Sequence, residues 1–137
     1  LHGEEGPAYC DEVRRRTGVA VIKAARVHDA GDVRALETYR VDYHLLDTHV
    51  PGIPGGTGET FDWELAAQRR SKVPLILSGG LDAHNVGAAI RAVRPFAVDT
   101  ASGTEAEPGR KDPEKLEAFA EAVRAAGAEL AAEAEVA

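Results

Sequence analysis

Carboxylates and glycines stand in series at the ends of three apolar runs of this chain. The runs are Asp42–Leu46 ending at Asp47, Leu75–Ser78 ending at Gly79-Gly80, and Phe96–Asp99 followed by Thr100-Ala101-Ser102-Gly103. A carboxyl group can donate or accept a proton, and a glycine loop can bring backbone N–H groups close to an anion. Parallel α/β barrels collect such groups at the C-terminal ends of their strands. The series therefore indicates acid–base chemistry on a small anionic molecule.

The anion signal comes from Ser78-Gly79-Gly80 and from Ala101-Ser102-Gly103, which follow consecutive apolar runs and precede helical patterns. Loops at the ends of the last two strands are where phosphate-binding barrels hold phosphate. Two such loops in consecutive units are more specific than one. The alternative is that both segments are only tight strand-to-helix turns.

Asp47 and Asp99 each stand where a run meets its loop, so each carboxyl group is expected at the mouth of the sheet. A partly desolvated carboxyl group near a phosphate has a reason to keep its proton and to act as a general acid. An N-cap or turn role explains either residue equally well.

The segment 48–60 is too long and too rich in glycine for a minimal turn, and Gly55-Gly56-Thr57-Gly58 lies at its centre. These four residues are predicted to form a flexible loop that closes over a bound molecule. A plain surface excursion is the alternative.

These residues must be positioned by alternating strands and helices, since short β-branched or Leu-rich runs alternate with Ala-rich stretches of helical period. Strands are predicted at Val19–Ala24, Asp42–Leu46, Leu75–Ser78 and Phe96–Asp99, and Leu1-His2 is predicted to end an earlier strand. Helices are predicted at Pro7–Arg16, Gly31–Tyr39, Trp63–Arg70, His84–Arg91 and Pro113–Ala126. Asp62, Asp82 and Asp112 are candidate caps. The pattern predicts an α/β fold of the (β/α)₈ TIM barrel class, with residues 1–137 forming one domain that covers about the last four βα units. The segment 127–137 either extends the last helix or frays.

The amino-acid composition of the chain excludes several classes of function. The chain is 44% hydrophobic with a formal charge of −7, which argues against a nucleic-acid surface. No run approaches the about 20 apolar residues of a membrane span, and no signal peptide is visible, so a cytoplasmic protein is expected. The single cysteine, Cys10, excludes an internal disulfide and is expected to pack as a small hydrophobe. No metal site is expected, because His44 and Asp47 are an odd number of residues apart and face opposite sides of a strand.

Several segments together resemble phosphoribosylanthranilate isomerase, in order and with fitting spacing from Leu1 to about Ala125. The segments are Leu45-Leu46-Asp47-Thr48, Gly55-Gly56-Thr57-Gly58-x-Thr60-Phe61-Asp62-Trp63, Leu77-Ser78-Gly79-Gly80-Leu81-x-x-x-Asn85-Val86, Val98-Asp99-x-x-Ser102-Gly103-x-Glu105 and Pro108-Gly109-x-Lys111-Asp112. Leu1-His2-Gly3 also resembles the end of that family's fourth strand, and Val21-Ile22-Lys23 its fifth strand.

The resemblance implies a (β/α)₈ barrel of tryptophan biosynthesis. Such an enzyme isomerises N-(5′-phosphoribosyl)anthranilate by an Amadori rearrangement without metal or organic cofactor. It implies Asp47 as the general acid and Asp99 as a hydrogen-bonding partner of the sugar or amine. It also implies a phosphate cradle, which consists of Gly79, Gly80, Ala101, Ser102 and Gly103. Two residues depart from the family pattern, Glu59 where relatives often have Lys and Ala101 where they have Ser.

The family's general-base cysteine and its carboxylate-binding arginine belong to earlier units that this sequence does not contain. By this resemblance the chain alone is expected to be nearly inert, since a general base is worth about 10²–10⁴ in rate. A complementing N-terminal fragment or a second copy in a homodimer is the expected partner. The alternatives are a non-catalytic phosphate-binding partial barrel, or another phosphate-binding barrel such as indole-glycerol-phosphate synthase.

Overall fold

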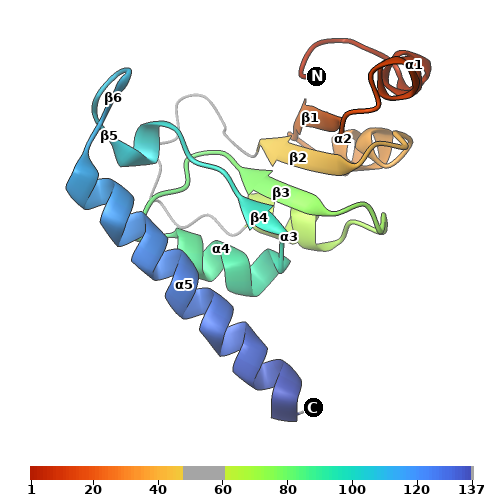
Figure 1. The fold of residues 1–137 in the computed structure, drawn as a ribbon. Coiled ribbons are helices and arrows are strands. Elements are labelled where there is room, and N and C mark those ends of the chain that lie inside the picture. The colour runs from red at the N-terminus through yellow and green to blue at the C-terminus, as the bar shows by residue number, and fades with distance from the viewer. Residues whose placement is uncertain (48–60, 137) are drawn as a thin grey trace.

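The computed structural model describes residues 1–47 and 61–136 and contains one parallel sheet of four strands in the order β1-β2-β3-β4 (Figure 1). The strands are β1 Ile22–Arg26, β2 Tyr43–Asp47, β3 Leu75–Ser78 and β4 Ala97–Val98. The helices are α1 Pro7–Thr17, α2 Ala30–Leu36, α3 Phe61–Ala67, α4 Val86–Val93, the 3-10 turn η1 Ser102–Thr104 and α5 Pro113–Val136. A short hairpin of β5 Glu105–Glu107 and β6 Arg110–Lys111 lies between η1 and α5. The βα alternation expected from the sequence is confirmed.

The two faces of the sheet differ in burial. Along β2 the even positions His44 and Leu46 are fully buried, whereas Tyr43, Leu45 and Asp47 are only half-buried. The buried face packs against the helices through Leu36, Leu77, Val86 and Ala89, among other apolar residues. Because paired residues of neighbouring strands share a face, Asp47 and Ser78 both belong to the less covered face. One face of the sheet thus forms the core, and the other carries Asp47.

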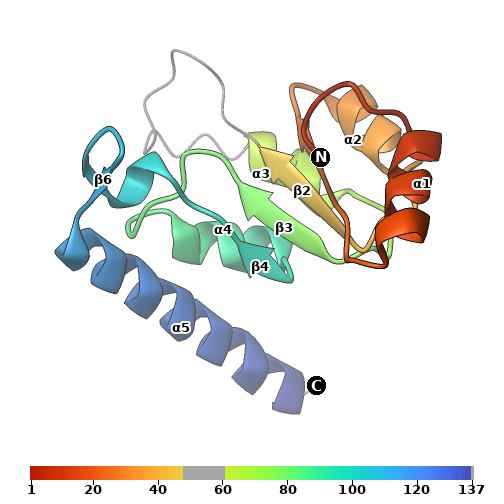
Figure 2. The same cartoon turned by 45° about the horizontal axis from the view of Figure 1, so that its top comes forward.

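The chain start lies beside β1, as expected, but Leu1 and His2 are not assigned to a strand. The Leu1 nitrogen donates to the carbonyl oxygen of Ile22 at 2.9 Å, and the Leu1 carbonyl accepts from the N–H of Ala24 at 2.9 Å. These two hydrogen bonds form a parallel bridge opposite Lys23. The free edge of β1 is therefore partly paired, and the N-terminus lies on the side of the molecule that carries α1 and α2 (Figure 2).

The prediction for the first strand was wrong at both ends, since β1 is Ile22–Arg26 rather than Val19–Ala24. The β-branched Val19 misled the prediction, but it is 59% exposed and lies outside the strand. Strand β1 extends to Arg26 because Arg26 pairs with Asp47, the last residue of β2. Lys23 therefore lies inside the strand and not at its end. Its ammonium group is buried and donates to Gly3 O and Glu5 Oε2, at 2.6 and 2.9 Å.

The boundaries of the other elements shifted by up to about three residues, apart from the end of α5. β3 has the predicted bounds, while β4 is shorter than the predicted Phe96–Asp99. Asp82 and Asp112 confirm their cap role, because each accepts two backbone N–H bonds at the turn before α4 or at the start of α5. Cys10 is 1% exposed in a small apolar cluster, as expected. Helix α5 continues to Val136, so the chain end extends the last helix.

A buried histidine joins β2 to the end of α3. His44 is fully buried, and its Nε2 lies 3.0 Å from the carbonyl oxygen of Tyr39, which can only accept a proton. The neutral ring therefore donates from Nε2 and accepts at Nδ1 from the Arg69 guanidinium, 3.2 Å away. Burial lowers the pKa of His44 below its ordinary value of 6.5, against the opposing effect of the Tyr39 carbonyl.

The burial of His44 predicts that the folded state begins to lose stability at a higher pH than the range in which carboxylates titrate. The unfolded chain protonates His44 near pH 6.5, whereas the lowered pKa means that the folded chain protonates it only at lower pH, so stability present above pH 6.5 is lost as the pH falls. Urea unfolding between about pH 7.5 and about pH 5 measures this slope. His44→Gln is expected to flatten it, whereas His84→Gln, at an exposed position, leaves it unchanged. An equal slope in wild type and His44→Gln would contradict the prediction.

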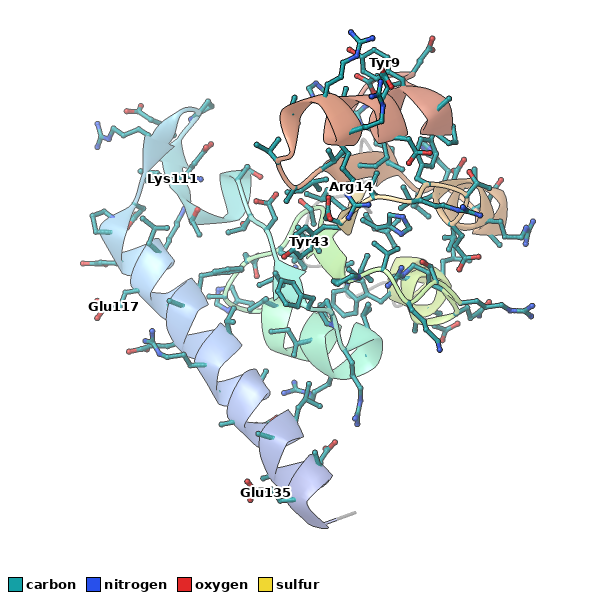
Figure 3. The ribbon with its side chains drawn as sticks, turned by 45° about the vertical axis from the view of Figure 1, so that its right-hand side comes forward. Tyr9, Arg14, Tyr43, Lys111, Glu117 and Glu135 are labelled. Carbon is teal, nitrogen blue, oxygen red and sulfur yellow. The ribbon has the colours of Figure 1, made fainter. Side chains whose placement is uncertain are left out.

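Helix α5 packs on α4 through one stripe, which consists of Phe119, Ala122, Val123, Ala126 and Leu130. The opposite side faces solvent, as the outward side chains of Glu117 and Glu135 show (Figure 3). Gly127 lies inside this helix, and a Cβ added there would meet no atom within 4 Å.

Gly127→Ala is expected to raise the free energy of unfolding by about 0.5–1 kcal/mol, because alanine loses less backbone entropy in a helix. Urea unfolding of the purified variant measures the change. Destabilisation would mean that the Gly127 surface is covered by another part of the protein.

Candidate functional site

The C-terminal ends of the strands carry a row of polar side chains on the less covered face. Arg26 pairs with Asp47, and Asp47 pairs with Ser78, in the strand register. The Arg26 Nε lies 3.9 Å from Asp47 Oδ2, and the Ser78 hydroxyl donates to Asp99 Oδ2 at 2.9 Å. The register therefore places one cation, two carboxylates and a hydroxyl along one line at the mouth of the sheet.

Beside this row lies a hollow of about 180 Å³, which we call the mouth hollow. Five residues that the sequence predicts as site residues line this hollow, and they come from the ends of three strands. They are Asp47, Gly79, Gly80, Ala101 and Ser102. Ser78, Leu81 and Thr100 are the other described residues that line it. Asp99 does not line the hollow, but its bond to Ser78 places its carboxylate next to it. The structure thus brings together the residues that the sequence singled out on three separate segments.

The glycines of the first loop are required by their backbone conformation. Gly79 and Gly80 have φ angles of 102° and 61°, in the left-handed region that side chains disfavour. In this conformation the loop turns directly from β3 toward Asp82, whose carboxylate caps the following turn.

The two glycine loops are in direct contact. A Cβ on Gly103 would lie 2.0 Å from the carbonyl oxygen of Leu81, so only glycine fits there. The hydroxyl of Thr100 donates to the same carbonyl oxygen at 2.6 Å. In the described part of the chain, the backbone N–H groups of Ala101, Ser102 and Gly103 donate to no acceptor. Unused N–H groups beside a hollow are suited to an anion.

Lys111, on the β5–β6 hairpin, forms hydrogen bonds to the second glycine loop, residues 101–104 (Figure 3). Its ammonium group donates to the Ala101 carbonyl at 2.5 Å and to the Thr104 hydroxyl at 3.0 Å. Glu105 Oε1 lies 3.5 Å from the same nitrogen. The hairpin therefore fixes the conformation of residues 101–104 from outside the hollow.

Sequence reasoning assigned no role to Arg26 or to the side chains of Ser78 and Lys111. The signal for Arg26 was its place four residues after Ile22 in β1, which becomes visible only once the strand pairs in register with Asp47. For Lys111 the signal was the Pro108-Gly109 pair, since Gly109 has a φ of 81° at the hairpin turn.

Some of the predicted site residues lie in a part of the chain that the structure does not describe. The predicted flexible loop at Gly55, Gly56, Thr57 and Gly58 lies outside the described residues, as do His49 and Glu59. Across residues 1–47 and 61–136, no three His, Cys, Asp or Glu side chains are grouped to hold a metal ion. No helix in that part of the chain has the length and apolar character needed to cross a membrane.

Comparison with known proteins gives a consistent result. Residues 1–122 match the family described as N-(5′-phosphoribosyl)anthranilate (PRA) isomerase. N-(5′-phosphoribosyl)anthranilate isomerase of Citrifermentans bemidjiense is 52% identical over 116 residues, which are 85% of this chain and 54% of that protein. The chain thus spans about half the length of this curated relative.

Two solved structures have the same fold over most of the chain. The crystal structure of phosphoribosyl anthranilate isomerase from Thermotoga maritima superposes with a TM-score of 0.79 at 43% identity, over 91% of this chain and 60% of that one. A phosphoribosyl anthranilate isomerase in complex with reduced 1-(o-carboxyphenylamino)-1-deoxyribulose 5-phosphate superposes with a TM-score of 0.68 at 41% identity. That match covers 87% of this chain and 55% of that one.

Proposed function

The chain belongs to the N-(5′-phosphoribosyl)anthranilate isomerase family of TIM barrels, and we propose that it supplies the acid and phosphate-binding half of such an active site. The complete enzyme converts N-(5′-phosphoribosyl)anthranilate to 1-(2-carboxyphenylamino)-1-deoxyribulose 5-phosphate, a step of tryptophan biosynthesis. The observation that carries the proposal is the mouth hollow, where Asp47 faces both glycine loops.

The phosphate of the substrate is held by the backbone N–H groups of the second loop and by the close approach that Gly79 and Gly80 permit. Support comes from the N–H groups of Ala101, Ser102 and Gly103, which have no acceptor in the described chain. Ala at position 101 is compatible with this role, because the contact uses the backbone rather than a side chain. Lys111 keeps the loop in the required conformation.

Asp47 protonates the ring oxygen of the phosphoribosyl group, and the ring opens to an imine. A general base then removes the proton from the adjacent carbon, and the enolamine relaxes to the ketone. Arg26, 3.9 Å from Asp47, stabilises the carboxylate that proton transfer leaves behind. Asp99, oriented by Ser78, accepts a hydrogen bond from the sugar or the amine.

The general base lies in a part of the barrel that this sequence does not contain. Cys10 does not take that role, since it is buried on α1 and desolvation raises the pKa of its thiol. A complementing N-terminal segment is therefore the partner that supplies the base, because a second copy of the chain contains the same residues and no additional base.

The test joins the N-terminal part of the Citrifermentans bemidjiense relative to Leu1, which gives what we call the completed barrel. Loss of the substrate's fluorescence measures turnover. We expect turnover by the completed barrel and none above buffer by the 137-residue chain alone. A completed barrel that folds by circular dichroism but does not turn over the substrate would favour a phosphate-binding partial barrel without catalysis. Turnover by the chain alone would show that no further general base is needed.

A further inference from the structure

A second hollow lies at the opposite, N-terminal end of the sheet, where β3 and β4 begin. It has a volume of about 320 Å³ and is lined by Arg69, Lys72 and Arg94, together with apolar residues that include Pro74 and Phe96. No carboxylate is among the described residues that line it. We call it the basic hollow. Three cations around one hollow are unusual in a chain whose formal charge is −7.

Arg69 is the cation that most needs an anion. Its guanidinium group is held in place by His44 Nδ1 at 3.2 Å and by the Val73 carbonyl at 2.7 Å, which leaves further N–H donors of its fork unused. No described carboxylate forms an ion pair with it. Glu37 exerts a Coulomb attraction, but its carboxylate accepts from the N–H of Ser71 instead. Desolvation lowers the pKa of Arg69, because burial of the guanidinium is costly, and the attraction of Glu37 offsets this only in part.

The other two cations stand at the rim. Arg94 has a φ of 50° and a ψ of 54°, and it is followed by Pro95, which disfavours helical conformations in the preceding residue. This is the one positive φ on a described non-glycine residue, and such strain is concentrated at functional positions. Arg94 bonds to Glu133 at 2.8 Å and stays 64% exposed. Lys72 is exposed and makes no hydrogen bond in the described chain.

We propose that the basic hollow binds a phosphate-class oxyanion, such as inorganic phosphate or a diphosphate group, separately from the mouth hollow. The planar fork of Arg69 offers paired donors to such an anion, and Lys72 adds a mobile ammonium group from the rim. Arg94 lies on the α4 side, where its guanidinium already pairs with Glu133 and so contributes less to the positive charge of the hollow than Arg69 and Lys72. The two hollows lie at opposite ends of the strands, so a bound anion here touches no residue of the candidate active site.

The test titrates the ¹⁵N-labelled 137-residue chain with pyrophosphate, and separately with inorganic phosphate, in low-salt buffer. NMR shifts are expected at residues 69–75 and 93–96, with an affinity that differs from any shifts at residues 79–81 and 100–103. Lys72→Ala is expected to weaken binding at the basic hollow about fivefold or more. Arg94→Gly removes the third cation and relieves the positive φ, so it tests the same site in a chain expected to fold well.

Arg91→Ala is the matched control. Arg91 also lies on α4 and also pairs with α5, through Glu129 at 2.9 Å, but it does not line the basic hollow. Its loss is expected to leave pyrophosphate binding unchanged. The proposal is overturned if shifts occur only around the mouth hollow, or if Arg91→Ala weakens binding as much as Lys72→Ala does. The first outcome leaves the proposed isomerase function standing, since that function rests on the mouth hollow alone.

Discussion

Asp47→Asn in the completed barrel is expected to reduce kcat by about 10²–10⁴-fold, because an amide of the same shape cannot protonate the ring oxygen. Asp47 is half-buried on the less covered face of the sheet and is not part of the apolar core cluster, so the substitution is expected to leave that cluster intact. The loss of substrate fluorescence under saturating substrate measures kcat, and substrate dependence gives KM. We expect KM to change little, since the proposed phosphate site consists of the glycine loops and does not use the Asp47 side chain.

Arg26→Gln serves as the neighbouring control. It removes the cation 3.9 Å from Asp47 but leaves the carboxyl group in place, so its effect on kcat is expected to be about tenfold or less. If Asp47→Asn keeps kcat within tenfold of the unmodified enzyme, Asp47 is not the general acid and Asp99 becomes the candidate.

Gly103→Ala is expected to separate the two glycine loops. The new Cβ would stand 2.0 Å from the Leu81 carbonyl oxygen and 2.9 Å from the Thr100 hydroxyl, so backbone must move. Overpacking of this kind costs about 1–3 kcal/mol of unfolding free energy. Because the movement displaces the N–H groups of residues 101–103, KM is expected to rise about tenfold or more while Asp47 keeps its place.

Gly87→Ala gives the comparison in the adjacent helix α4. A Cβ there meets only the Arg91 side chain, at 3.6 Å, which is ordinary contact. Urea unfolding and KM are measured for both variants. A normal KM for Gly103→Ala would show that the phosphate does not depend on the second loop.

The sequence was sufficient for the order of elements and for the positions of the site segments. Strand β3 was predicted with its observed bounds because its three apolar residues and Ser78 are followed by a double glycine. The β5–β6 hairpin was missed because its strands have three and two residues and are mostly charged, so neither alternation nor apolar content marks them. The bounds of β1 were wrong because pairing with β2, rather than β propensity, decides where that strand ends.

The residues of the candidate site were likewise predictable only where a local sequence pattern marks them. Asp47 and the two glycine loops could be found because local patterns mark them, and they meet in one hollow. The contact between Gly103 and Leu81 joins residues 22 positions apart and depends on how the two loops pack. The bond from Arg69 to His44 spans a similar separation and has no local pattern. Such contacts are set by tertiary packing, which a single sequence does not display.

The alternation along β2 has a consequence for how this protein can change over generations. Tyr43, Leu45 and Asp47 face the mouth side of the sheet, while His44 and Leu46 are sealed beneath the helices. Packing therefore constrains His44 and Leu46 more than Tyr43 and Leu45. Substitutions at Tyr43 and Leu45 are expected to accumulate with less loss of stability than substitutions at the two buried positions between and beside them.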